Sequence, residues 1–306
     1  MKPSSNDTEP AFSNVDVLNF LASGTFYTLL DYSIYTHTTP NLGNDAETVL
    51  LIHGFPTSSW DWQGIREELA QVAQVEAIDM LGFGFSDKPN KRNYTIHKQA
   101  TLHLEYLKAK GISSVHILCH DYGVSVAQEI LARHANNETG IEIKSCCFLN
   151  GGLFPETHKA LLIQKLLLSP LGPFLNRFLA FDKFKSSFSS VFGQNTKPTD
   201  SELRDFWEII NYKEGKHLFH NLITYMRDRI THRERWLQAL IASPIPLALI
   251  NGSVDPVSGE HLVNRYKELG CRIDSLTQLP DIGHYPQVEA PERVLAAYIN
   301  FLNTIK

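Results

Sequence analysis

The sequence predicts an α/β protein with a mostly parallel, doubly wound sheet of eight strands and a helical cap inserted after the sixth strand. Strand-like apolar runs alternate with helical patterns from about residue 49 to 152, and the alternation resumes at residue 246. Between residues 153 and 235 only helical patterning is found. Strands that alternate with helices form parallel sheets, because each parallel connection crosses the sheet through a helix.

The expected strands are short runs rich in aliphatic and β-branched side chains, bounded by turn-forming residues. They span residues 25–30, 32–37, 49–52, 75–78, 115–119, 143–149, 246–250 and 272–276. The first two would form an antiparallel hairpin around Asp31. We therefore predict a core at residues 1–152 and 236–306 and a cap at 153–235, lying over the carboxyl edge of the sheet, where ligands bind.

Composition excludes several classes of function. The 306 residues are 43% hydrophobic and 20% charged, which is typical of a globular protein, and the net charge of −5 offers no basic surface for nucleic acid. Residues 1–10 lack the apolar core of a signal peptide, and no run reaches the roughly 18 apolar residues of a membrane span. The four cysteines lack CxxC spacing and should be buried thiols. We expect a cytoplasmic protein without a membrane span; the oligomeric state is not predicted.

A tight strand-to-helix turn is predicted at residues 115–128. An aliphatic run ends in Cys119-His120-Asp121-Tyr122-Gly123, and a helical pattern begins at once. Small residues on both sides of such a turn let strand and helix approach closely. This turn is typical of a nucleophile elbow, which lifts one side chain above the sheet. The lifted side chain would be Asp121.

Two further polar residues also follow predicted strands. Asp255 comes directly after an apolar strand, and His284 lies between the last strand and the last helix. Each alone is an ordinary loop residue, but the three would meet at one edge of a parallel sheet. We predict that Asp121 is a nucleophile, His284 a base and Asp255 its orienting acid. The backbone amides of Phe55 and Tyr122 would form the oxyanion hole.

Several stretches resemble the α/β-hydrolases of the epoxide hydrolase and haloalkane dehalogenase group. They are residues 53–59, 81–89, 120–123, 150–158 and 283–287. The order Asp121, Asp255, His284 is the nucleophile–acid–histidine order of that fold. The resemblance implies a hydrolase without cofactor or metal, acting with water on a small apolar molecule.

An aspartate nucleophile determines the chemistry that we expect. A carboxylate is already ionised at neutral pH and attacks without a base. Asp121 would form a covalent alkyl-enzyme ester, and His284 would then activate the water that hydrolyses it. Because attack on a carboxylic ester would give a reactive anhydride, saturated carbon in an epoxide or a haloalkane is the preferred target.

Epoxide hydrolysis is the best specific prediction. In dehalogenases, as the resemblance implies, side-chain N–H groups hold the halide at the positions of Tyr122 and Phe55, and neither residue has one. Epoxide hydrolases use cap tyrosines as proton donors; Tyr225 and Tyr212 are the candidates, although Tyr225 could equally be a packing aromatic. The alternatives are haloalkane dehalogenation, another hydrolysis, or a weakly catalytic binding or regulatory protein.

Other polar residues are assigned structural roles. Ser125 lies beyond the turn, and Glu156 is a less suitable acid than Asp255. His217 and His220 could share a helix face but lack a third ligand, so no metal site is predicted. Four arginines interleaved with acidic residues would form a solvated helix face. They are Arg227, Arg229, Arg233 and Arg235.

Overall fold

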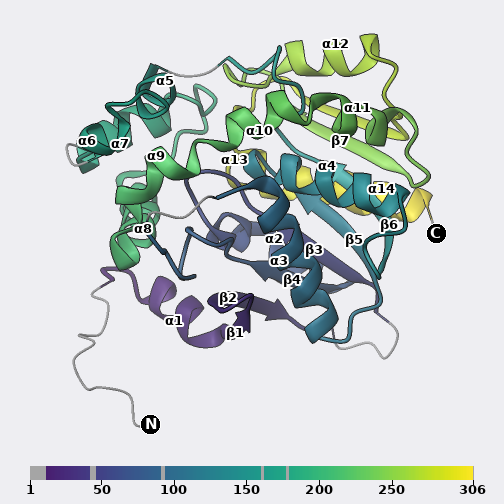
Figure 1. Cartoon of the computed structure of the whole chain (residues 1–306), viewed down its shortest axis with the longest axis horizontal. Coiled ribbons are helices and arrows are strands. Elements are labelled where there is room, and N and C mark those ends of the chain that lie inside the picture. The colour runs from purple at the N-terminus through teal and green to yellow at the C-terminus, as the bar shows by residue number, and fades with distance from the viewer. Residues whose placement is uncertain (1–11, 42–45, 91–93, 160–161, 177–178, 306) are drawn as a thin grey trace.

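A single twisted sheet forms the centre of the molecule (Figure 1). The computed structural model describes residues 12–41, 46–90, 94–159, 162–176 and 179–305; the predicted polar start of the core, residues 1–10, lies outside them. The strands are β1 (Thr25–Leu29), β2 (Tyr32–Thr39), β3 (Thr48–Ile52), β4 (Gln74–Ile78), β5 (Ser114–Cys119), β6 (Glu142–Phe148), β7 (Leu247–Gly252) and β8 (Ser275–Leu279).

The predicted sheet of eight strands, mostly parallel, is confirmed. Its order is β1-β2-β4-β3-β5-β6-β7-β8. β2 runs antiparallel to both β1 and β4, and the remaining pairs are parallel. The hairpin between β1 and β2 turns through Leu30 and Asp31, which have positive φ angles of 48° and 67°. The parallel strands therefore end together at one edge.

Helices cover both faces of the sheet, because alternate strand residues point to opposite sides. Val49 and Leu51 of β3 belong to one apolar cluster, and Leu50 and Ile52 belong to the other; all four are fully buried. The helices outside the insertion described below are α1 (Val15–Ser23), η1 (Ser59–Trp62), α2 (Gln63–Leu69), α3 (Ile96–Ala109), α4 (Tyr122–Ala135), α12 (Glu260–Glu268), α13 (Pro286–Glu289) and α14 (Pro291–Thr304).

Residues 149–246, between β6 and β7, form a segment that we call the helical insertion. Its helices are α5 (Leu162–Leu167), α6 (Gly172–Leu175), α7 (Phe181–Ser189), α8 (Asp200–Asn211), η3 (Tyr212–Leu218), α9 (Phe219–Leu222), α10 (Tyr225–Thr231) and α11 (Arg233–Ile241). α5, α6 and α7 lie at the end of the molecule opposite the C-terminus (Figure 1). The predicted boundary at residue 235 falls inside α11, which packs on α4.

Two elements differ from the prediction. α1 was not predicted, although Asn14 caps it by accepting a hydrogen bond from the Asp16 amide and Val17 and Phe20 are buried on one face. β8 begins at Ser275, three residues later than expected. The preceding Asp274 instead accepts a hydrogen bond from the Leu247 amide at 2.8 Å and pairs with Arg272, so it joins the start of β7 to the loop before β8.

The cysteines are all buried and unbridged, as the sequence predicted. Among the helices of the described residues, none is both long and apolar enough to cross a membrane. Within the same ranges, no three histidine, cysteine or acidic side chains lie close enough together to hold a metal ion.

Candidate active site

The elbow at the end of β5 adopts the predicted sharp turn. Asp121 lies between β5 and α4 with φ of 44° and ψ of −105°, a conformation that costs a non-glycine residue on the order of 1–3 kcal/mol. The Asp121 amide donates to the Asn150 carbonyl at 2.7 Å. A Cβ on Gly123 would lie 2.5 Å from the Ile52 carbonyl oxygen, so only glycine lets α4 start this close to β3.

The two oxygens of the Asp121 carboxylate have different surroundings. Oδ1 accepts a hydrogen bond from the Phe55 amide at 3.0 Å, which is the position predicted for an oxyanion-hole donor. Oδ2 lies 3.4 Å from Nε2 of His284. The Asp121 side chain makes no capping hydrogen bond with the first-turn amides of α4. One oxygen therefore faces the predicted oxyanion hole, and the other faces the predicted base.

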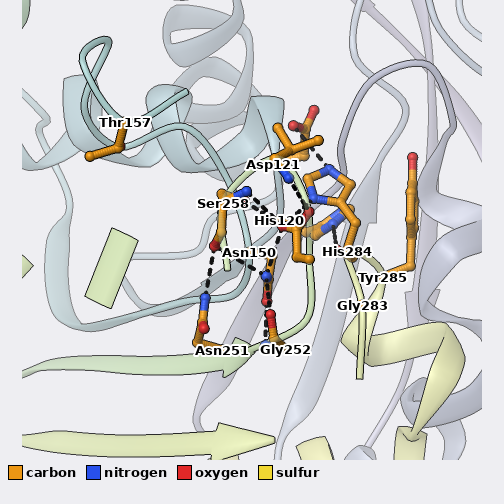
Figure 2. A network of polar contacts seen from close by, with 12 residues as sticks. His120, Asp121, Asn150, Thr157, Asn251, Gly252, Ser258, Gly283, His284 and Tyr285 are labelled. Carbon is orange, nitrogen blue, oxygen red and sulfur yellow. Dashed lines mark hydrogen bonds and ion pairs between the residues drawn. The ribbon is translucent and has the colours of Figure 1, made fainter. Parts of the chain in front are cut away.

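His284 is oriented by the predicted acid. Its Nδ1 lies 2.7 Å from Oδ2 of Asp255. Figure 2 shows His284 beside Asp121 and His120. The main chain of His284 is also held, since its amide donates to the Val191 carbonyl and its carbonyl accepts from Nε2 of His120, both at 2.8 Å. The structure thus brings Asp121, His284 and Asp255 together at the carboxyl ends of β5, β7 and β8.

Asp255 is held by donors that we had not predicted. Its Oδ2 accepts from Nδ2 of Asn150 at 2.9 Å and from Oγ of Ser258 at 2.7 Å, and its Oδ1 accepts from the Val257 amide. Asn150 and Ser258 are labelled in Figure 2. Asn150 also ties β6 to β7, because its Oδ1 accepts from the Gly252 amide at 2.6 Å. The position of Asn150 directly after a predicted strand could have indicated that it belongs to the site.

The charges of Asp121, Asp255 and His284 stabilise one another. Burial lowers the pKa of His284, but the neighbouring carboxylates of Asp255 and Asp121 outweigh it and raise that pKa to about 10. Burial raises the pKa of both carboxyls, and His284 reverses the effect, so both lie below their ordinary range. The pKa of His120 is lowered to about 3 by burial and by the charge of His284. In the free protein Asp121 is therefore an anion and His284 a cation.

A mostly apolar cavity of about 220 Å³ opens beside Asp121 and His284. Phe55, Val257 and Tyr285 line it from the sheet side. The helical insertion supplies much of the opposite wall, with Leu167, Phe184, Phe188, Val191 and Phe219 among the apolar side chains. The space suits a small apolar molecule placed against the carboxylate.

The predicted tyrosines lie in different places. Tyr225 is fully buried, with its ring 4.6 Å from that of Tyr122 and 6.2 Å from that of Phe55, behind the cavity wall. Tyr212, expected at the substrate site, instead packs against Phe85 with a ring distance of 5.3 Å and does not line the cavity. α8 ends just before it, and the chain turns away through positive φ angles at residues 213 and 214.

Tyr285 also belongs to the site, although we did not predict it from the sequence. It lines the cavity, and its hydroxyl donates to the Phe55 carbonyl at 3.2 Å. Burial raises the pKa of this phenol well above its ordinary value, so the proton is retained at neutral pH. Its position in the sequence, directly after His284, could have indicated this place in the site.

The prediction of a solvated helix face at the four arginines holds for Arg227, which is exposed, and is wrong for Arg229. Arg229 is 1% exposed and donates from Nε to Oγ of Ser125 at 2.7 Å. Arg235 donates to the buried Glu129, and Arg233 to Glu156. Alternating charge described this stretch poorly because α11 packs on the elbow helix α4 and Arg229 of α10 reaches Ser125 in the same helix.

Comparison with known proteins agrees with this fold. A family model described as "alpha/beta hydrolase fold" matches residues 47–291. The chain belongs to the α/β-hydrolase fold family. This α/β-hydrolase is 41% identical to the mesoderm-specific transcript protein of Mus musculus, over 92% of its own length and 86% of that protein. It is 36% identical to the putative hydrolase LipZ of Mycobacterium tuberculosis, over 84% and 89% of the two chains.

Among solved structures, the fold of this α/β-hydrolase is similar to that of a haloalkane dehalogenase from Bradyrhizobium elkanii, the DbeA-M1 loop variant. The TM-score is 0.76 and the sequence identity 20%, over 92% of this chain and 97% of the other. At this identity the likeness concerns the fold. The roles of the individual side chains depend on the distances given above.

Proposed function

We propose that this α/β-hydrolase uses Asp121 as a nucleophile, without a cofactor, to hydrolyse epoxides carried on small apolar molecules. The observation that carries the proposal is the arrangement of the two carboxylate oxygens. Oδ1 accepts from the Phe55 amide at 3.0 Å, and Oδ2 faces His284 at 3.4 Å. A serine-type hydrolase would place a protonated hydroxyl there, whereas this carboxylate is ionised and buried.

In the first step, Oδ2 of Asp121 attacks a ring carbon of the epoxide. The carbon–oxygen bond breaks, its electron pair goes to the oxygen, and an alkyl-enzyme ester forms. The new alkoxide takes a proton from a buried phenol. Tyr285 lines the cavity, and Tyr225 lies behind Phe55; burial raises the pKa of both, so each retains its proton at neutral pH.

Once Asp121 is an ester, the pKa of His284 falls, and its proton passes through solvent to the phenolate left by the first step. In the second step, neutral His284 takes a proton from water, which attacks Cγ of Asp121. The negative charge moves to Oδ1, where the amides of Phe55 and Tyr122 stabilise it. The intermediate collapses, and the diol leaves with the proton held by His284. The resulting carboxyl group of Asp121 then transfers its proton to His284, which restores the ion pair of the free protein.

The surroundings of the site support an apolar epoxide more than a haloalkane. Neither Tyr122 nor Phe55 carries a side-chain N–H for a halide, and the Tyr122 ring is buried against Phe83 at 5.4 Å. We propose that residues 153–235 act as the cap over the core formed by residues 1–152 and 236–306. Because its four buried cysteines are unbridged, we also propose a cytoplasmic location.

The test is a single-turnover reaction in heavy-oxygen water with styrene oxide, a terminal alkyl epoxide, a primary bromoalkane and p-nitrophenyl butyrate. We expect an epoxide to be hydrolysed and the label to enter Asp121, because water attacks the carboxyl carbon of the ester. The His284→Gln variant should accumulate a covalent adduct at Asp121, detected by mass spectrometry, while the matched His134→Gln variant at the far end of α4 should not.

Label found only in the product of a substrate that is turned over would contradict the aspartate mechanism. No turnover and no adduct with any of the four compounds would favour the binding or regulatory alternative. Preferred hydrolysis of the bromoalkane, with label in Asp121, would keep the mechanism and replace the substrate class.

A further inference from the structure

Arg229 connects the helical insertion to the nucleophile elbow. It lies in α10, far along the chain from Asp121, yet its side chain is 1% exposed. Its Nη2 donates to the Asp121 carbonyl at 3.1 Å, and its Nε donates to Oγ of Ser125 at 2.7 Å. The insertion therefore contacts the residue whose backbone has the unusual positive φ angle.

The surroundings are shaped for a guanidinium group. Its Cζ lies 4.4 Å above the centre of the Tyr225 ring, a cation–π contact. A Cβ on Gly152 would lie 2.2 Å from Nη1, so glycine at this position leaves the space that the group needs. Two directed donors and a flat stacking face are properties of arginine that lysine lacks.

Among the described residues, no acidic side chain forms an ion pair within 4 Å of the Arg229 guanidinium group. Arg133, Arg233 and Arg235, in contrast, each form one. Buried cations are normally paired, because an unpaired one is costly. Asp121, whose main-chain carbonyl accepts the hydrogen bond from Nη2, is an acidic residue that this charge affects: burial raises the pKa of its carboxyl, and the charge of Arg229, after that of His284, lowers it.

We propose that Arg229 is a positioning residue that holds the Asp121 elbow from the insertion and stabilises negative charge on the Asp121 carboxyl group. The inference rests on the proposed nucleophilic role of Asp121 and adds a residue to it. The helical insertion would then contribute to hydrolysis of the ester as well as to the wall of the cavity.

The two chemical steps should respond to this charge in opposite directions. Esterification converts the anion of Asp121 into a neutral ester, so a nearby cation opposes it slightly. Hydrolysis restores negative charge on Oδ1 in the tetrahedral intermediate, so the same cation favours it. Removal of the charge should therefore slow hydrolysis and leave alkylation unchanged or somewhat faster.

The experiment measures both steps of the full-length protein with styrene oxide, by rapid quenching and mass spectrometry of the covalent ester. For Arg229→Gln we expect ester hydrolysis slower on the order of 10-fold and alkylation within about threefold of wild type. The ester should accumulate, and kcat and KM should fall together while kcat/KM is nearly unchanged. A loss of folding alone would lower the amplitude of both steps equally.

Two variants separate charge from structure. Arg229→Lys keeps the charge and loses the forked geometry, so it should hydrolyse the ester faster than Arg229→Gln even if both are less stable. Arg227→Gln is the matched control on the same helix, since Arg227 is exposed and reaches the Leu168 carbonyl at 3.4 Å. Its two rates should stay within about twofold of wild type.

Equal hydrolysis rates for the lysine and glutamine variants, or a wild-type hydrolysis rate in Arg229→Gln, would overturn the inference. Failure of the proposed function has a different signature, because no ester would then form in wild type or in His284→Gln. An ester that forms normally and is hydrolysed normally without Arg229 contradicts the role of Arg229 alone.

Discussion

At the scale of single residues, Asp121 and His284 control each other's charge. Their side chains are 3.4 Å apart and almost fully buried, so each ionised form stabilises the other. In the proposed reaction, esterification removes the negative charge of Asp121. The histidine then loses one of its two carboxylate neighbours, so its pKa falls and it releases its proton, and the neutral imidazole can accept a proton from water in the second step.

This coupling predicts a large change in the pKa of His284 when Asp121 is neutral. In the free protein that pKa is raised to about 10, because the attraction of Asp255 and Asp121 exceeds the effect of burial. Asp121→Asn imitates the uncharged ester, so the pKa of His284 should fall by at least about one unit. Nuclear magnetic resonance titration of the imidazole, assigned with His284→Gln, measures both values.

A matched control is Asp281→Asn, which removes a carboxylate three residues before His284 that pairs with Arg293 at the surface. It should leave the pKa of His284 unchanged. An unaltered pKa in Asp121→Asn would show that Asp121 does not hold the proton on His284, and the proposed change in basicity between the two steps would be wrong.

At the scale of secondary-structure elements, the sequence predicted the parts of the site that depend on local pattern. The turn at Asp121 and the strand ends before Asp255 and His284 follow from apolar runs and small residues. Arg229 and Tyr212 were misplaced because their surroundings are set by helices distant in sequence. Charge alternation along α10 and α11 cannot reveal that α11 packs on α4 or that Arg229 reaches Ser125 in α4.

Glu129 of α4 is the residue that joins these helices. Its side chain is 1% exposed and accepts hydrogen bonds from Trp236 at 2.9 Å and Arg235 at 3.1 Å in α11, and from Arg133 at 2.8 Å. Burial raises the pKa of Glu129, but these three donors outweigh it and the net shift is downward. The ionised form therefore stabilises the fold.

We expect Glu129→Gln to lower the free energy of unfolding by about 2 kcal/mol at neutral pH, because the charge-assisted hydrogen bonds from Trp236 and from the partly exposed Arg133 and Arg235 weaken. Glu105→Gln, which breaks an exposed pair with Lys108, should cost at most about 0.5 kcal/mol. Urea unfolding followed by circular dichroism measures both.

The pH dependence of this difference has a defined sign. The folded pKa of Glu129 lies below its ordinary value of 4.5, so its stabilising effect is complete above that value. The effect is lost as pH falls through the folded pKa. The gap between wild type and Glu129→Gln should therefore shrink as pH falls below 4.5; a gap that grows would contradict an ionised, stabilising Glu129.

At the scale of the whole molecule, the sheet and the helical insertion contribute differently to the site. The sheet edge positions Asp121, Asp255 and His284, whereas α5, α7 and α9 supply much of the apolar wall of the cavity. The chemistry should therefore depend on the sheet edge, and the size of the accepted molecule on the insertion. Neighbouring serines on α7 allow this division to be tested.

Ser187 lines the cavity, and the adjacent Ser186 is exposed. Ser187→Phe should fill part of the 220 Å³ space and raise KM for a long-chain terminal epoxide by about 10-fold or more, with a smaller effect on styrene oxide. Ser186→Phe adds the same side chain outside the cavity and should leave KM unchanged for both epoxides. In both variants the ester should still form at Asp121, because the sheet edge is untouched. Equal effects of the two substitutions on the long epoxide would mean that substrate enters elsewhere, and that α7 does not select it.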